Sequence, residues 1–134
     1  KNKIENEAGL NAMITEALEA VGLLHAIDYI PSELSGGMKK RIALARTLIM
    51  QPKIILYDEP TSGLDPVTAK EISLLITEVQ NRFHTASIII THDLACARIA
   101  SDRMIILHEG VNYAESTYDE LAEMEDKTVK AFFV

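Results

Sequence analysis

The sequence predicts an α/β fold with a parallel sheet. Stretches with helical periodicity alternate with short, continuous apolar runs, which are typical of strands in a parallel sheet. Polar residues stand where these runs end: Asp58 and Glu59 follow Ile54–Tyr57, and His92 follows Ser87–Thr91. Because the carboxyl ends of parallel strands meet at one edge of a sheet, we expect these side chains at the ligand-binding edge.

The composition indicates a folded, acidic domain. Apolar residues make up 48% of the 134, which is enough for a core and argues against disorder. Thirteen basic and twenty acidic residues leave a net charge of −7, which disfavours nucleic acid as a partner. The single cysteine, Cys96, excludes an internal disulfide framework and fits a reducing cytosol. The first residue is Lys1 rather than Met, which indicates that something upstream has been removed.

Two helices are predicted in the first third of the chain. Apolar residues from Leu10 to Val21 recur every three or four positions, which predicts an amphipathic helix ending at Gly22. Residues 23–33 form a connector or a short helical turn. A second helix begins directly after the sequence Leu34–Gly37, with Ser35 as its N-cap.

The middle of the chain alternates between strand and helix. The apolar run Ile54–Tyr57 predicts a strand that is buried on both faces. Asp65 as N-cap and Pro66 at the first helical position open a long helix, whose apolar stripe continues to Phe83. Ser87–Thr91 is the second predicted strand.

The last third predicts smaller elements. A short helix covers residues 94–100, and Arg103–His108 forms a third strand. A tight turn joins this strand to Val111–Glu115 as a hairpin. Thr117 and Glu120 form a capping box for the final helical stretch.

The polar residues at the strand ends suit phosphoryl chemistry. A carboxylate such as Asp58 can hold Mg²⁺ against nucleotide phosphates, and Glu59 beside it can orient an attacking water. The imidazole of His92 can hydrogen-bond a terminal phosphate. Each pattern by itself fits a solvated turn or an ordinary loop equally well.

The turn before the second helix suits an anion. Gly36 and Gly37 allow backbone N–H groups to approach phosphate oxygens, and the hydroxyl of Ser35 adds a donor. The basic residues 39–41 crowd the first turns of the helix, where positive charge opposes the helix dipole and a bound anion is favourable. Taken alone, an ordinary loop and N-cap also account for this pattern.

Together, these segments occur in one order and with tight spacing, and the chain resembles the ATP-binding-cassette (ABC) ATPases. Leu34–Met38 is similar to the signature loop of that family, and Ile54–Glu59 to its Walker B strand with the catalytic glutamate. Ser62–Asp65 is similar to the D-loop, and His92 to the switch histidine.

The resemblance implies a P-loop NTPase-like core and a division of the chain. Residues 1–33 would be the end of the helical subdomain, and residues 34–134 the C-terminal part of the ATPase core. It also implies ATP and Mg²⁺ as ligands, and a subunit that powers transport through a separate membrane permease. Such a subunit lies at the cytoplasmic face of the inner (plasma) membrane.

The resemblance also implies a role for each site residue. Asp58 would support Mg²⁺, Glu59 would activate the hydrolytic water and His92 would contact the γ-phosphate. Cassettes of the family pair head to tail and trap two ATP molecules between them, so a homodimer is expected. In that dimer the Ser35–Gly37 turn would reach the ATP of the opposite subunit, and Asp65 would lie at the seam.

One expected motif does not occur in this sequence. None of the six glycines belongs to a G-x-x-x-x-G-K-[ST] pattern, so the phosphate-cradling Walker A loop is missing. We therefore expect this chain alone neither to bind ATP tightly nor to hydrolyse it. The runs Ile54–Tyr57 and Ile88–Thr91 would present an unpaired apolar edge or face, so self-association is expected.

The transported substrate is less constrained. Glu33–Arg46 followed by Tyr57 is similar to the ATPases of bacterial Mce-type phospholipid transport systems, although ordinary variation among other transporters also produces this pattern.

Two other functional classes stay open for this chain. A soluble ABC-family ATPase acting on nucleic acid or ribosomes is disfavoured by the acidic balance. A truncated, non-catalytic cassette kept as a binding module is disfavoured by the presence of Asp58, Glu59 and His92 together.

Overall fold

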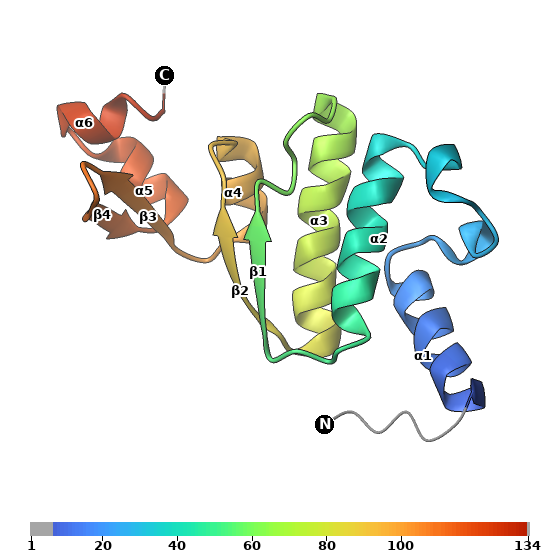
Figure 1. Ribbon diagram of the computed structural model, residues 1–134. Coiled ribbons are helices and arrows are strands. Elements are labelled where there is room, and N and C mark those ends of the chain that lie inside the picture. The colour runs from blue at the N-terminus through green and yellow to red at the C-terminus, as the bar shows by residue number, and fades with distance from the viewer. Residues whose placement is uncertain (1–6, 134) are drawn as a thin grey trace.

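The computed structural model describes residues 7–133. It confirms the α/β class, with a parallel strand pair between a group of helices and a C-terminal hairpin unit (Figure 1). The elements, in chain order, are α1 Glu7–Ala20, η1 Leu24–Ala26, η2 Pro31–Glu33, α2 Gly36–Leu48, β1 Ile54–Asp58, α3 Pro66–Phe83, β2 Ala86–Ile90, α4 Leu94–Ala100, β3 Met104–His108, β4 Val111–Ser116, α5 Tyr118–Glu123 and α6 Lys127–Lys130.

Two small sheets are present among the described residues. β1 and β2 pair in parallel with Ile54 opposite Ala86 and Asp58 opposite Ile90, and α3 is the crossover between them. The third predicted strand, β3, does not join this sheet. It pairs with β4 as an antiparallel hairpin, as the turn chemistry predicts, with a register shift after Ile106.

The helix ends follow the predicted capping residues. The hydroxyl of Ser35 accepts a hydrogen bond from the backbone N–H of Met38 at 3.2 Å, which starts α2. Asp65 caps α3 with Pro66 at its first position, and Thr117 starts α5 with a capping box. These local signals act through the backbone N–H groups that every helix N-terminus leaves without partners, so they can be read from sequence.

The main core joins the helices to the inner face of the parallel strands. Its buried side chains come from α1 and the turn that follows it, from α2, α3 and β1, and from the end of α4. Val21, Ile76 and Val79 are almost completely enclosed. A second, smaller cluster of Ile106, Leu121 and Val129 lies in the C-terminal unit. The predicted division at residues 33 and 34 stays a prediction; residues 1–6 of its first part lie outside the described residues.

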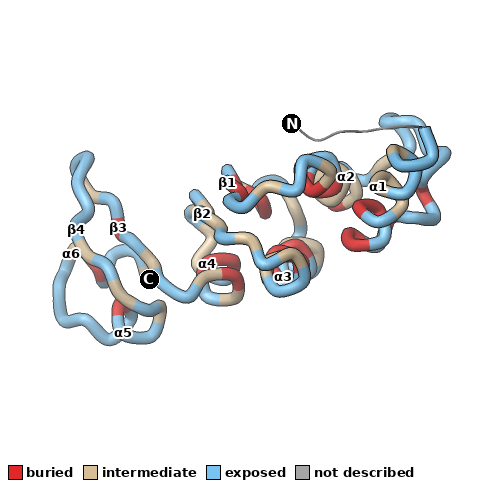
Figure 2. The backbone as a smooth tube through the Cα atoms, turned by 90° about the horizontal axis from the view of Figure 1, so that it is seen from below, coloured by how far each residue is buried: buried red, intermediate tan, exposed pale blue. Residues whose placement is uncertain are grey.

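The expectation that the first strand is buried on both faces is wrong for this structure. Ile55 and Tyr57 point into the core, whereas Ile54 and Leu56 are 60% and 69% exposed. Figure 2 shows that α3 and α4 lie against one face of the β1–β2 strand pair. No described element covers the other face of that pair. The apolar run predicts a strand with two apolar faces, but burial of the second face needs a layer that these residues do not supply.

None of the described helices combines the length and the apolar character needed to cross a membrane.

Candidate active site

The candidate site lies at the carboxyl ends of β1 and β2. Asp58 is the last residue of β1 and is exposed, and Glu59 follows it directly. The backbone N–H of Glu59 donates to the carbonyl of Ile90 at 2.9 Å, which continues the strand pairing by one residue. This bond brings the segment after β1 beside the segment after β2, as the parallel topology predicts.

Glu59 and His92 are in direct contact. The Nδ1 atom of His92 lies 2.8 Å from Oε1 of Glu59, with the imidazole 80% exposed and the carboxylate 34% exposed. The hydrogen bond to Glu59, followed by the negative charge of that carboxylate, raises the pKa of His92 above its ordinary value. With Nδ1 on the carboxylate, the Nε2 edge of the exposed ring can meet a ligand.

The backbone of Glu59 has an unusual conformation. Its φ is +47°, in the left-handed region, although it is not glycine and precedes Pro60. Its carbonyl oxygen accepts two hydrogen bonds, from Nζ of Lys40 at 3.0 Å and from the N–H of Ser62 at 3.2 Å. Its Oε2 atom is buried without a hydrogen-bond partner among the described residues, so the polar contacts of this carboxylate are not complete in the structure.

A second polar contact ties the two loops together. Thr61 is buried, and its hydroxyl donates to Oδ2 of Asp93 at 2.8 Å. The other carboxylate oxygen of Asp93 caps α4 by accepting from the N–H groups of Ala95 and Cys96. Since Thr61 follows Glu59 by two residues and Asp93 follows His92 directly, this contact fixes the two loops that carry the catalytic candidates.

The glycine turn packs against the start of α3. A Cβ on Gly37 would lie 2.7 Å from Cγ2 of Thr68, and a Cβ on Gly36 would lie 3.5 Å from Cδ2 of Leu64. At Gly37, therefore, only a residue without a side chain fits this approach. Within residues 7–133, no hydrogen bond joins the Ser35–Gly37 turn to Glu59 or His92.

Asp65 has a clear structural task. Its Oδ1 atom accepts from the N–H groups of Val67 and Thr68 at 3.0 and 3.1 Å, and its Oδ2 accepts from the Thr68 hydroxyl. The bond from the Thr68 hydroxyl, followed by those from the backbone, lowers the pKa of Asp65. Asp65 and the glycine turn thus share Thr68 as a neighbour.

Comparison with known proteins identifies the family. The model of the ABC transporter family matches residues 2–62. The solved structure of cbiO1 from Clostridium perfringens, described as part of the ABC transporter complex cbiONQ, superposes on 91% of this chain with a TM-score of 0.85 and 35% identity. This chain belongs to the ABC transporter ATP-binding domain family.

Other relatives agree with this family. The lipoprotein-releasing system ATP-binding protein LolD of Legionella pneumophila is 43% identical over 101 residues, which are 75% of this chain and 44% of LolD. The methionine import ATP-binding protein MetN 1 of Staphylococcus aureus is 35% identical over 130 residues, which are 97% of this chain and 38% of MetN 1.

The chain covers only part of its relatives. It spans 49% of cbiO1. It spans 53% of the ATP-binding cassette MJ1267 in the solved structure of its ADP conformation, which it matches with a TM-score of 0.84 and 28% identity. The chain thus spans about half the length of the solved ABC domains and less than half of LolD and MetN 1.

The site fits the Mg²⁺ that accompanies nucleotides in ABC ATPases. No cluster of three or more metal-binding side chains occurs among residues 7–133, and Asp58 is a single exposed carboxylate. Mg²⁺ keeps several waters and is commonly held by one or two carboxylates together with substrate phosphates, rather than by a cage of protein ligands. The single carboxylate of Asp58 in this ABC domain therefore suits a metal ion that is held partly by the phosphates of the nucleotide.

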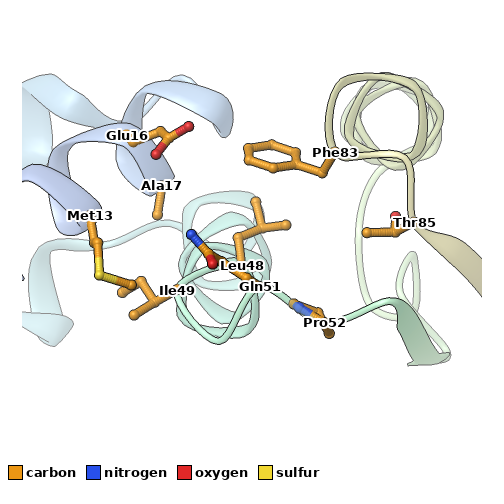
Figure 3. A pocket seen from close by; sticks show the side chains of 9 residues that line it. All are labelled: Met13, Glu16, Ala17, Leu48, Ile49, Gln51, Pro52, Phe83 and Thr85. Atoms are coloured by element: carbon orange, nitrogen blue, oxygen red, sulfur yellow. The ribbon is translucent and has the colours of Figure 1, made fainter. Parts of the chain in front are cut away.

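Two cavities are lined by residues of the described helices and strands of the ABC domain. One, of about 230 Å³, lies between α2, β1 and α3 and is lined by Lys40, Tyr57 and Asp58 among others, so it adjoins the site. Burial raises the pKa of Tyr57, in its wall, to about 12. The other, of about 220 Å³, is lined by Met13, Phe83 and seven further residues (Figure 3). It lies at the opposite end of β1 from Glu59.

Sequence reasoning missed three residues that organise the site of this ABC domain. Lys40 appeared only as one of several basic residues, and Thr61 and Asp93 were not singled out. Asp93 had a usable signal, because an Asp directly before a helical stretch is a typical N-cap. The Lys40 and Thr61 contacts span 19 and 32 residues, and no local pattern reports such pairs.

Proposed function

We propose that this chain is the part of an ABC transporter ATPase that carries the signature turn and the hydrolytic residues. The observation that carries the proposal is the contact of Glu59 with His92 at the carboxyl ends of two parallel strands, directly beside Asp58. Ligands of open α/β folds bind at this edge. Membership of the ABC family makes ATP the expected nucleotide.

The proposed chemistry assigns one task to each side chain. Asp58 holds Mg²⁺, which when bound neutralises phosphate charge during phosphoryl transfer. The carboxylate of Glu59 accepts a hydrogen bond from the attacking water and orients it. His92, oriented through Nδ1 by Glu59, donates from Nε2 to the terminal phosphate. Its raised pKa favours the protonated form, in which both nitrogens are donors.

The remaining site residues act at a subunit interface in this proposal. The Ser35–Gly37 turn offers helix N-terminal N–H groups to the ATP of a second copy of the subunit, and Asp65 lies at the seam between the copies. Support comes from the ATP-binding cassette MJ0796, whose solved structure is a dimer bound to ADP and Pi. It matches this chain at 29% identity with a TM-score of 0.73, over 88% of this chain and 51% of MJ0796.

The partner in this proposal is a separate membrane permease, with this subunit bound to it at the cytoplasmic face of the inner (plasma) membrane. Support comes from cbiO1, which is part of a transporter complex, and from the names of LolD and MetN 1 as ATP-binding proteins of release and import systems. We propose phospholipid as the substrate, on the similarity of Glu33–Arg46 and Tyr57 to Mce-type ATPases. Co-purification of the permease, followed by lipid analysis of the complex, tests this assignment.

ATP turnover by the native gene product that carries this chain tests the proposed function. Glu59→Gln keeps the size of the side chain but removes its capacity as a base, so we expect kcat to fall by about 10²–10⁴. The 134-residue chain alone is expected to show no turnover. A native gene product that binds no nucleotide would favour the binding-module alternative, and capture of ribosomes or DNA instead of a permease would favour the soluble ATPase.

A further inference from the structure

The side chain of Lys40 makes a contact that the proposed chemistry does not use. Lys40 lies on the second turn of α2 and is half-buried, and its Nζ donates to the backbone carbonyl of Glu59 at 3.0 Å. This is a hydrogen bond from a charged donor across two separate elements, and such bonds are stronger than neutral ones. It joins the helix that begins at the signature turn to the residue that carries the catalytic carboxylate.

The Glu59 backbone needs such a contact. A positive φ is unfavourable for a residue with a side chain, and the following Pro60 restricts the same residue further. Strained backbones persist only where their surroundings hold them. Two of the holding bonds come from neighbouring backbone, at Ile90 and Ser62. Lys40 is the only described side chain that donates to the Glu59 carbonyl.

We propose that Lys40 is a positioning residue for Glu59: by holding the backbone carbonyl it keeps the left-handed conformation and so directs the carboxylate toward His92. The same contact ties the Ser35–Gly37 turn, at the start of α2, to that carboxylate. This inference rests on the proposed function, in which Glu59 orients the attacking water.

The neighbouring basic residues do not share this task. Lys39 is exposed and carries the same charge. Arg41 donates to the carbonyl of Val21 and to the carboxylate of Glu71, both at 3.1 Å, so its guanidinium is engaged on the α1 and α3 side. Lys39 is therefore a matched control for Lys40, with equal charge and one residue away on the same helix.

ATP turnover by the native gene product is the first measurement. Lys40→Met removes the donor while keeping most of the side-chain length, and we expect kcat to fall about tenfold with little change in KM. Lys39→Met should leave kcat unchanged, since the charge of Lys39 near a bound anion would act on KM. Lys40→Arg, which retains a charged donor, should recover most of the loss in kcat. Thermal unfolding, monitored by circular dichroism, confirms that each variant is folded. Equal kcat values for Lys40→Met and the unaltered protein would overturn the inference.

A second measurement does not depend on ATP turnover. Titration of histidine-labelled 134-residue chain by NMR follows the ring of His92. If Lys40 positions Glu59, Lys40→Met weakens the Glu59–His92 contact and lowers the His92 pKa. Loss of a nearby cation alone would raise this pKa instead, so the sign separates the two effects. If the unaltered gene product shows no turnover, the proposed function fails, and this titration still decides the role of Lys40: an unchanged or raised pKa refutes it.

Discussion

Gly37→Ala should destabilise this chain, although alanine is the better helix former. A Cβ at position 37 would lie 2.7 Å from Cγ2 of Thr68, far closer than carbon atoms pack without displacement. The added methyl must therefore push the starts of α2 and α3 apart or rotate Thr68. Rotation is costly, because the Thr68 hydroxyl is hydrogen-bonded to Asp65.

The magnitude follows from two opposing effects. Overpacking in a well-packed region costs about 1–3 kcal/mol. Replacing glycine by alanine in a helix returns up to about 1 kcal/mol through backbone entropy and helix propensity. With the full gain subtracted, we therefore expect a net loss of up to about 2 kcal/mol of unfolding free energy. Gly36→Ala is the matched control, because its Cβ would meet Leu64 at an ordinary 3.5 Å.

Urea denaturation of the 134-residue chain measures the effect. Thr68→Ser removes the clashing Cγ2 methyl and keeps the hydroxyl that donates to Asp65, so the double variant Gly37→Ala with Thr68→Ser should recover the stability that the clash costs. The packing argument is refuted if Gly37→Ala is as stable as Gly36→Ala, or if Thr68→Ser lowers the stability of both backgrounds equally.

Three further outcomes are expected. Glu59→Gln should return the raised pKa of His92 toward its ordinary value in an NMR titration. Because the pKa of His92 is raised in the folded state, the stabilisation from its contact with Glu59 is fully present below the ordinary histidine pKa. This stabilisation is lost as the pH rises through the folded-state pKa. Leu56→Lys should reduce self-association in sedimentation velocity, because Leu56 is 69% exposed on the uncovered face of the strand pair, whereas Leu74→Lys on α3 should have little effect. Asp93→Ala should lower the unfolding free energy by about 1–3 kcal/mol in thermal or urea unfolding, since it removes both the α4 cap and the partner of a buried hydroxyl, and Asp93→Asn should cost less.

Much of the candidate site could be predicted because its signals are local. Asp58, Glu59 and His92 each follow an apolar strand, and parallel strands bring their carboxyl ends to one edge. The structure places Glu59 and His92 2.8 Å apart, although 33 residues separate them in sequence. The roles of these residues in catalysis, and of the Ser35–Gly37 turn and Asp65 at a dimer seam, stay predictions.

The sequence by itself determined the element order, the helix caps and the family resemblance. Helix periodicity, an N-cap such as Ser35 or Asp65, and the Thr117 capping box all depend on residues within one or two turns of each other. Short motifs in a fixed order are local information of the same kind, and they suffice to indicate the ABC family.

Only the tertiary structure decided which surfaces are buried and which distant residues meet. The missing Walker A loop predicts an uncovered apolar edge or face, but the apolar run of β1 does not show which of its side chains are exposed, because an apolar strand looks the same whether or not a second layer covers it. The bond from Lys40 to the Glu59 carbonyl, and that from Thr61 to Asp93, depend on how α2, β1 and β2 pack together. Sequence spacing carries no record of such contacts, since they are set by the relative positions of whole elements rather than by the preferences of individual residues.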